Sequence, residues 1–595
     1  MTHLLIVSIG PVQEFIASAR RSRDLWFGSW LLSELAKAAA LAIVEQDGLD
    51  NLIFPAPTSL EDLQAGSELN VANKVIAEIQ RPAAEVAQQI RDKIWAQLHI
   101  IRDQAYKFVN ATEFDQENAW KQIDDLPDVY WAALEIPNRH QYHAVRAELE
   151  ALMAARKVTR NFSAVTWGSP IPKSSLDGMR ESVIPEYAYD REANLLYQQY
   201  GVRPGERLCG VGLLKRHGVR GTNPHFSSTS HLAAWPLLQQ IDDQVHVETY
   251  IKKLRDLKIA EDDLYPVEGT PFGYDGHLIF EERLSEFFED KDVLTKARAA
   301  LYNFRSAAWG GKSPSPYYAL LAADGDRMGA TIDNLRDIDS HRKLSVALSK
   351  FARKAPNIVR TNGGSPIYAG GDDVLALVPL PKALACAQQL AQEFRNTIAG
   401  FKDEDAQSPT LSVGIVITHH LEPLQDALGL ARRAEKAAKK LDGKDALAVT
   451  LSKRSGEDRT VVGRWGDIDK RLASLISLYG AQKIPSGVAY ELLRLASLLS
   501  ELDEAVAPRI SEVETLRILK RKRGQQGRTQ ISDIDTAMIE DALGQIENSP
   551  KVIGDDAKNS LAELASEMII ASVLANQPQA KSISTSVVTN VGEMP

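Results

Sequence analysis

The stretches that decide the fold are YYALLAADGD (317–326) and IYAGGDDVLALVP (367–379). The first is an apolar run that ends in acidic residues, as a buried strand does where it leaves the core. The second consists of two short apolar runs joined by Gly-Gly-Asp-Asp, which is typical of a tight hairpin. We therefore expect three strands whose acidic ends meet at one edge of a sheet.

The segments around this hairpin extend the pattern to a whole domain. The elements expected, in order, are strand 317–323, helix 337–359, strands 365–368 and 374–378, helix 383–398, strand 411–418, helix 423–441 and strand 446–451. The order βαββαβ, with one further strand, is a split βαβ arrangement. The fold class predicted here is α+β with a ferredoxin-like palm.

The rest of the chain shows weaker patterns. A strand at 4–10, a long helix over 12–44 broken only near Gly28, a short strand at 52–54 and a helix over 72–109 open the sequence. Residues 160–235 are rich in Gly, Pro and Ser, which indicates a loop-rich connecting region. Beyond about 465 the patterning is helical, for example at 489–502 and 560–574, and the last twenty residues resemble a poorly ordered tail.

Length and composition limit the kind of protein. A chain of 595 residues is too long for one hydrophobic core, so three or four domains are expected. The 44% hydrophobic and 25% charged residues are ordinary for globular protein, and no apolar run of membrane-spanning length occurs. Two cysteines cannot form a disulfide framework, and we expect a cytoplasmic protein. A net charge of −10 argues against non-specific attraction to nucleic acid.

The acidic residues at the sheet edge carry the chemistry. In a palm of this order Asp324 should lie beside Asp372 and Asp373, and clustered carboxylates are the ligands that Mg²⁺ and Mn²⁺ prefer. Gly370 and Gly371 would let a triphosphate approach the backbone closely. The alternative is an ordinary turn, because Asp and Gly are common turn residues. Three adjacent acids would repel one another without a cation, so we predict a metal site.

Two further polar residues have two interpretations each. Asp326, two residues beyond Asp324, is either a structural turn residue or an additional ligand. Lys439, near the end of the helix before the last palm strand, is either a solvated lysine favoured by the helix dipole or a phosphate-binding lysine.

At these residues the chain resembles a known family. YYALLAADGDRMG, IYAGGDDVLALVP and LSVGIVITHHLEPL are similar to the large polymerase/cyclase subunit of CRISPR type III effector complexes, in its Cmr-type (III-B) branch. SIGPVQEFIASARRSRDLWFGSWLLS and GERLCGVGLLKR resemble the same family, so the resemblance covers residues 4 to about 456. The resemblance implies four units: a first, non-catalytic palm (1–160), a connecting domain (161–300), a second palm with the active site (301–462) and a helical domain (463–595).

The resemblance also implies a function. Two ATP molecules would lie between the palms and be converted to cyclic oligoadenylates when a complex of crRNA and other Cmr subunits captures target RNA. Asp324 and Asp372 would hold Mg²⁺ or Mn²⁺ with help from Asp373. The residues that would contact the nucleotide are Gly370, Gly371, Lys439 and Ser345. For Ser345, in the segment HRKLS, an ordinary helix surface is the alternative.

The first palm has LIFPAP where the acidic hairpin would be, so the resemblance implies that it holds an acceptor ATP without performing chemistry. Arg20, Arg21 and Arg23 are candidates to contact that nucleotide. Their alternative interpretation is a solvated basic face of a helix.

The sequence departs from the family pattern in two places. None of the 12 histidines is followed by Asp, and the sequence opens at the first palm, so we expect no HD-type DNase. Relatives often carry Cys-x-x-Cys where this chain has Cys209-Gly-Val-Gly212, so we expect no zinc.

Other functions remain open on the sequence alone. A stand-alone cyclic dinucleotide synthase is one, although the additional domains argue against it. A scaffold subunit without catalysis is another, although the intact acids argue against that. The basic segment RILKRKRGQQGR (517–528) is either a solvated loop or a contact for RNA or a neighbouring subunit.

Overall fold

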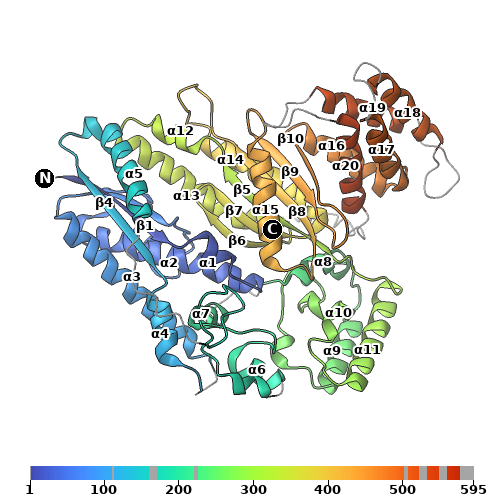
Figure 1. Cartoon of the computed structure of the whole chain (residues 1–595), viewed down its shortest axis with the longest axis horizontal. Coiled ribbons are helices and arrows are strands. Elements are labelled where there is room, and N and C mark those ends of the chain that lie inside the picture. The colour runs from blue at the N-terminus through green and yellow to red at the C-terminus, as the bar shows by residue number, and fades with distance from the viewer. Residues whose placement is uncertain are drawn as a thin grey trace, which may run out of the picture.

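A computed structural model of the chain provides the fold, and Figure 1 shows two β-sheets, each accompanied by helices, with two further groups of helices beside them. The residues described in this structure are 2–109, 113–159, 170–191, 193–219, 226–500, 507–521, 533–548 and 559–575. The mixture of two sheets and many helices is the predicted α+β class.

The second sheet has six strands in the order β10-β9-β8-β5-β7-β6. Its strands are β5 (Tyr317–Gly325), β6 (Ser365–Gly370), β7 (Asp373–Val378), β8 (Leu411–His419), β9 (Ala446–Leu451) and β10 (Arg459–Arg464). The β8–β9 pair is parallel and the other pairs are antiparallel. The palm strands and hairpin expected from the sequence are confirmed, whereas β10 is an additional edge strand that the sequence analysis missed.

Helices cover both faces of this sheet. They are α12 (Met328–Asp333), α13 (Ile338–Thr361), α14 (Ala383–Ile398) and α15 (Leu424–Lys439). Alternate residues of β5 belong to different cores: Leu321 packs with α13 and α14, and Leu320 packs with α15. Successive side chains of a strand point to opposite faces, so a run as apolar as β5 needs helices on both sides.

The first sheet has the order β2-β3-β1-β4 and is antiparallel throughout. Its strands are β1 (His3–Gly10), β2 (Leu52–Phe54), β3 (Lys74–Ile79) and β4 (Asp128–Glu135). The helices of this unit are α1 (Gln13–Ala17), α2 (Ser22–Asp47), α3 (Ala83–Tyr106), α4 (Gln116–Asp124) and α5 (Tyr142–Val158).

Two helix predictions in this unit were wrong. The helix expected from residue 72 begins only at Ala83, because residues 74–79 form β3 between β2 and β1. The predicted break near Gly28 lies instead before Ser22, and Gly28 is buried inside α2. A Cβ on Gly28 would lie 3.3 Å from Ile16 Cα, so this glycine allows α1 and α2 to pack closely.

The connecting region is more helical than the sequence indicated. It contains α6 (Ala193–Tyr200), α7 (Gly210–His217), α8 (Thr229–Leu238), α9 (Gln244–Asp256), α10 (Glu281–Leu284) and α11 (Lys291–Trp309). Buried Arg216 of α7 contacts Asp24 of α2 and Glu206, with a 3.0 Å ion pair to each carboxylate. These contacts fix the connecting region against the first palm.

Five helices make up the described C-terminal part: α16 (Ile468–Gly480), α17 (Gly487–Leu499), α18 (Ala507–Arg521), α19 (Asp533–Glu547) and α20 (Ser560–Ala575). The helical prediction is confirmed for this part. The basic segment 517–528 lies outside the described residues beyond Arg521, as does the predicted tail.

One described helix is long and apolar enough to pass a length-and-composition test for a membrane span. It is α2, with a mean hydropathy of 1.4 over its most apolar window. In the fold, 83% of that window is buried. The buried residues of α2 pack against the first sheet, α3 and the connecting region, as those of a core helix do.

The two palms face each other through reciprocal contacts. Helix α13 of the second palm packs against β2 of the first, and helix α2 of the first palm packs against β6 of the second. Each palm therefore places the helix after its first strand against the hairpin region of the other. This arrangement brings the acidic hairpin close to the boundary between the palms.

Candidate metal and nucleotide site

The acidic residues predicted from the sequence lie together at one edge of the second sheet. Asp324 is the penultimate residue of β5, and Asp372 and Asp373 occupy the turn between β6 and β7. Ala323 pairs with Val374 across the sheet, which places the two strand ends side by side. One carboxylate oxygen of each residue lies within 4.8 Å of the others.

Glycines make this approach possible. A Cβ on Gly325 would lie 2.7 Å from Asp372 Oδ2, so any side chain there would displace the carboxylate. Gly371 has φ of +65°, a conformation that other residues rarely adopt. Gly370 packs so closely under the ring of Tyr368 that a Cβ would overlap the phenol.

Electrostatic repulsion in the cluster changes its protonation. The low polarity of the surrounding protein, together with the Asp324 charge, raises the pKa of Asp372 to about 6. Desolvation by neighbouring protein atoms, with the charges of Asp372 and Asp324, raises the pKa of Asp373 well above its ordinary value. Carboxylates this close cannot all ionise easily unless a cation compensates them.

These residues fit a divalent cation by the chemistry of their donor atoms. Three carboxylates converge, and Asp373 is exposed while Asp324 and Asp372 are partly exposed, so a ligand can reach the site from solvent. Hard cations such as Mg²⁺ bind a few carboxylates and complete their shell with water or phosphate oxygens. Asp324, Asp372 and Asp373 would hold such an ion.

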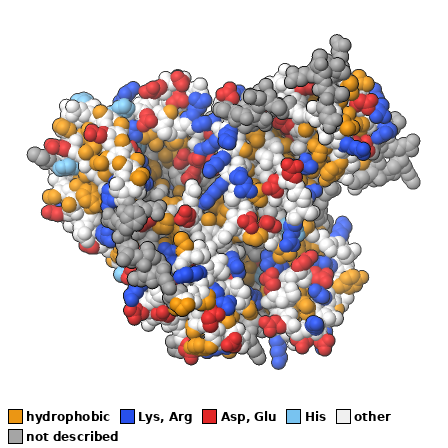
Figure 2. Space-filling model, in the orientation of Figure 1, with side chains coloured by type: hydrophobic (Ala, Val, Ile, Leu, Met, Phe, Trp, Pro, Cys, Tyr) orange, Lys and Arg blue, Asp and Glu red, His pale blue; other side chains and the backbone are white. Residues whose placement is uncertain are grey.

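Lys439 lies at this site and not on an isolated helix face. Its ammonium group forms an ion pair with Asp324 and donates to the Gly325 carbonyl at 3.3 Å. Glu435, one turn earlier on α15, lies 3.9 Å away. Figure 2 shows Lys and Arg side chains near the centre of this face, where α15 lies. Lys436 of that helix and Lys440, the residue that follows it, are exposed.

Asp326 lies in a buried network of hydrogen bonds. Its side chain is buried, and Oδ2 accepts hydrogen bonds of 2.8 Å from both Thr410 and Ser412 and one of 3.2 Å from the Asp445 amide. Burial raises the pKa of this carboxyl group. These bonds tie the end of β5 to β8 and to the segment before β9.

Ser345 is not among the residues gathered at the acidic turn. Its hydroxyl is buried and accepts a 2.8 Å hydrogen bond from the Ala56 amide, just beyond β2 of the first palm. In this conformation Ser345 therefore joins α13 to the other palm. Its contact with adenine stays a prediction.

The three arginines of the first palm differ from one another. Arg20 is exposed, Arg21 donates to the Gly201 carbonyl and lies over the Tyr197 ring, and Arg23 donates to the Gly218 carbonyl. Arg21 and Arg23 thus contact the connecting region, which excludes a fully solvated basic face.

Cys209 caps a helix. Its sulfur accepts from the Gly212 amide at 3.3 Å at the start of α7. Burial raises the pKa of the Cys209 thiol to about 11, which disfavours the thiolate that zinc requires. Among the described residues, the grouping of His, Cys, Asp and Glu that is compact enough to hold a metal is the three-aspartate cluster.

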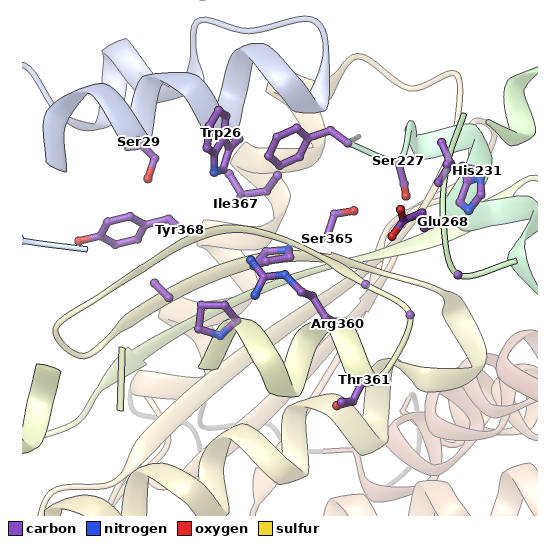
Figure 3. Close-up of a pocket in the computed structure, with 18 of the residues that line it drawn as sticks. Trp26, Ser29, Ser227, His231, Glu268, Arg360, Thr361, Ser365, Ile367 and Tyr368 are labelled. Atoms are coloured by element: carbon purple, nitrogen blue, oxygen red, sulfur yellow. The ribbon is translucent and has the colours of Figure 1, made fainter. Parts of the chain in front are cut away.

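A large cavity, which the sequence patterns did not predict, lies beside the hairpin (Figure 3). It lies between α2, β6 and the region around α8, and has a volume of about 730 Å³. Its wall includes Tyr368 and Ala369, directly before Gly370, and the tryptophans of WFGSW (26–30). The i,i+4 spacing of these tryptophans on one helix was the available signal in the sequence.

Two parts of the chain match known protein families, and both matches agree with the fold and the candidate site. Residues 317–448 match the second palm domain of Cas10/Cmr2, and residues 4–123 match the N-terminal region of the CRISPR-associated protein Cmr2. These matches and the two facing sheets define a double-palm protein. These matches confirm the resemblance seen in the sequence to Cmr2, the large subunit of type III-B CRISPR systems.

Individual relatives support this placement. The CRISPR system Cmr subunit Cmr2 of Pyrococcus furiosus is 26% identical over 76% of this chain. The match spans 62% of the length of that relative. Two cryo-EM structures of a type III-B Cmr-β complex, in the apo state and bound to cognate target RNA, have similar folds, with TM-scores of 0.65 and 0.62 and 14% identity. Each match covers 96% of this chain and 82% or 83% of the other.

Proposed function

We propose that this protein is the catalytic large subunit of a type III-B effector complex and makes cyclic oligoadenylates from ATP. The observation that carries the proposal is the convergence of Asp324, Asp372 and Asp373 within 4.8 Å at the palm turn. Carboxylates with raised pKa values beside a partly open surface are characteristic of functional sites. The match of residues 317–448 to the second palm domain of Cas10/Cmr2 supports the palm as the place of nucleotidyl transfer.

In this proposal the chain's own residues bind and orient the reactants. Asp324 and Asp372 hold the divalent ion, Mg²⁺ or Mn²⁺, and Asp373 assists. The bound ion would lower the pKa of an attacking 3′-hydroxyl and stabilise charge on the phosphoryl group. Gly370 and Gly371 let the triphosphate approach the turn, and Lys439 offers an ammonium group to it.

Lys439 would exchange its partner Asp324 for a phosphate when the site is loaded. The ammonium group now neutralises the carboxylate that would hold the ion. With Asp324 engaged as a metal ligand, the Lys439 ammonium group would be free to contact a phosphate oxygen. The lysine would therefore act as an internal counterion in the free site and as a phosphate ligand in the loaded one.

The first palm would contribute an acceptor site without a Gly-Gly-Asp-Asp turn of its own. Its β2–β3 connection runs through residues 55–73, whereas the second palm has a tight Gly-Gly-Asp turn at the corresponding place. We further propose that crRNA, target RNA and other Cmr subunits are the partners, that the complex works in the cytoplasm, and that target RNA switches the activity on. The Cmr-β structures with the same fold, one of them bound to target RNA, support this part.

The test uses the assembled complex with ATP, Mn²⁺ and target RNA, and mass spectrometry of the products. The Asp372→Ala, Asp373→Ala variant should assemble but give no cyclic product. A matched control, Glu404→Ala with Asp405→Ala, removes two adjacent exposed acids of the same palm and should keep full activity. Undiminished ATP conversion by the first variant would disprove the assignment, and inactivity of the wild-type complex would favour a scaffold.

A further inference from the structure

The outer edge of strand β4 has no strand partner among the residues that the structure describes. In the order β2-β3-β1-β4, β4 pairs with β1 alone. The Ile136 amide donates to the Thr2 carbonyl, and the Ile9 amide points the other way, to Asn73 beside β3. Antiparallel pairs bond to each neighbour through every second residue. The backbone groups of β4 that point away from the sheet therefore belong to Val129, Trp131, Ala133 and Glu135.

The other sheet edges in the described part of the chain are protected against a foreign strand. Strand β2 has three residues and an irregular register. Strand β6 contains Pro366, has a register shift and contacts α2. Strand β10 begins and ends with arginine and contacts α20. By contrast, β4 (DVYWAALE) has eight residues without proline or lysine, in regular register with β1. An open edge of this kind promotes aggregation unless something covers it.

An exposed tryptophan marks the face of β4 that lies opposite α5. Val129 and Ala133 share that face and pack against the core of the first palm. Trp131, between them, keeps 39% of its surface exposed. Large aromatic side chains are enriched where proteins contact one another, because they bury much area on binding. A strand added beyond β4 would cover part of the indole.

Helix α5 supplies apolar surface on the other face of this edge. Its Glu150 pairs with Lys74 of β3, toward the middle of the sheet, whereas its Arg156 lies over the Tyr130 ring of β4. Leu152, one turn before Arg156 and 43% exposed, therefore lies on the side of α5 that faces the outer edge. Figure 2 shows hydrophobic side chains gathered at the left of the view, over α5.

Charge distinguishes between two possible occupants of the edge. A second copy of this chain would add its own β4 antiparallel, across a two-fold axis. The exposed acids at the two ends of the strand, Asp128 and Glu135, would then meet those of the other copy. The net charge of −10 also opposes self-association. A strand of a different protein, with basic side chains near its ends, avoids this repulsion.

We propose that β4 accepts a β-strand of another protein subunit, which extends the first sheet through backbone hydrogen bonds. The added strand carries apolar side chains on both faces, to cover Trp131 and Leu152, and basic side chains near its ends. That this subunit is part of the effector complex rests on the proposed function. The contact lies at the opposite edge of the sheet from β2, the strand that packs against α13 of the second palm, so it leaves the boundary between the palms open.

Hydrogen exchange with single-residue resolution tests the backbone contact. The full chain is compared free and assembled with the other subunits on crRNA. The amides of Trp131 and Ala133 should exchange rapidly in the free chain and about tenfold more slowly in the complex. Those of Tyr130 and Ala132, which bond to β1, should be protected in both.

Two other exchange patterns would overturn the proposal. Rapid exchange of the Ala133 amide in the complex would show that no strand pairs with this edge. Protection of that amide already in the free chain would assign the edge to another occupant. The occupant would be a second copy if the protection grows with protein concentration, and a segment of the same chain if it does not.

A proline at the edge provides a binding test. Ala133→Pro removes one outward amide and keeps the bonds to β1, because proline is tolerated where the N–H group faces away from the sheet. It should weaken binding of the full chain to the other assembled subunits about tenfold, the effect of about 1.4 kcal/mol. Ala133→Ser retains the amide and should bind as the wild type does. Equal dissociation constants for the two variants would contradict the backbone contact.

A second variant leaves the backbone unchanged. Leu152→Glu alters an exposed side chain, so it should fold, and it should also weaken binding about tenfold. Leu60→Glu, at a leucine that is 47% exposed between β2 and β3, should have no effect. Unchanged binding of both Ala133→Pro and Leu152→Glu would overturn the docking site alone. A wild-type chain that does not join the crRNA-bound subunits would overturn the proposed function together with this inference.

Discussion

Gly325 follows Asp324 directly, and its bare Cα faces the Asp372 carboxylate. The carboxylates supply the ligand atoms, but their spacing depends on an absent side chain. A methyl group at this position would force Asp372 away from Asp324 or move the hairpin. The site is therefore constrained by packing as well as by charge.

We expect Gly325→Ala to weaken Mn²⁺ binding on the order of tenfold, as changes that misplace a metal ligand commonly do. The added Cβ would meet Asp372 Oδ2 at 2.7 Å and Met328 Cγ at 2.8 Å. Gly329→Ala is the matched control, because a Cβ there meets no atom within 4 Å. Electron paramagnetic resonance of free Mn²⁺ gives both affinities, and equal values would show that Gly325 does not set the geometry.

Lys439 provides a second test at this scale. Lys439→Met should raise the KM for ATP about tenfold and change kcat less, because a charge contact with phosphate serves substrate and transition state alike. Lys436→Met removes an exposed lysine of the same helix and should leave both constants unchanged. Steady-state kinetics of the activated complex decides between them. A fall in kcat without a change in KM would assign Lys439 to the chemical step instead.

Helix α13 joins the second palm to the first through buried polar contacts. Tyr142 of α5 and His341 of α13 share a 2.6 Å hydrogen bond. Nearby, buried Arg146 of α5 forms a 2.8 Å ion pair with the exposed Asp333 of α12, the helix before α13. Polar groups thus specify the contact between the palms, and one of these groups, the imidazole of His341, is titratable.

His341 makes the stability of this contact pH-dependent. Burial, with the positive charges of Arg146 and Lys74, lowers the pKa of His341 to about 4 from an ordinary value near 6.5. Between these values the unfolded chain binds a proton that the folded chain refuses, so stability falls as the pH drops from 6.5 to 4. The loss approaches roughly 3 kcal/mol at the acid end.

His341→Gln should remove this part of the acid sensitivity. The amide keeps a hydrogen-bonding group near Tyr142 and does not titrate. The melting temperature of the wild type should fall relative to that of the variant between pH 7.5 and pH 4.5, because protonation of His341 weakens only the wild type. A constant difference at both values would mean that His341 protonates equally well in the folded state.

Prediction from the sequence succeeded for elements defined by local patterns. The strand that ends in Asp324 and the Gly-Gly-Asp-Asp hairpin are each contained in about ten residues, so their juxtaposition followed from the strand order. Strand β3 failed, because KVIAEI (74–79) is short and apolar and joins a helical pattern without a strong break before Pro82. The cavity could not be foreseen, since α2, β6 and α8 meet only in three dimensions.

At the scale of the whole molecule, the cores cross the predicted domain boundaries. One core joins the first palm, the connecting helices and one face of the second sheet. The other joins the opposite face of that sheet to α16, α17 and α20. The predicted division at residue 462 would therefore cut through a shared core. We infer that the second palm and the C-terminal helices stabilise each other.

A buried ion pair tests this coupling. Arg471 of α16 and Glu567 of α20 lie 2.6 Å apart and are almost fully buried. Glu567→Leu leaves a buried, uncompensated guanidinium and should cost about 3–5 kcal/mol, whereas Arg471→Met combined with Glu567→Leu should recover most of that loss. Urea denaturation gives these free energies.

Helix α20 also contacts β9 and β10 of the second palm. Glu567→Leu should therefore also speed amide hydrogen exchange in those strands. Faster exchange confined to the C-terminal helices would show instead that the palm folds independently of them.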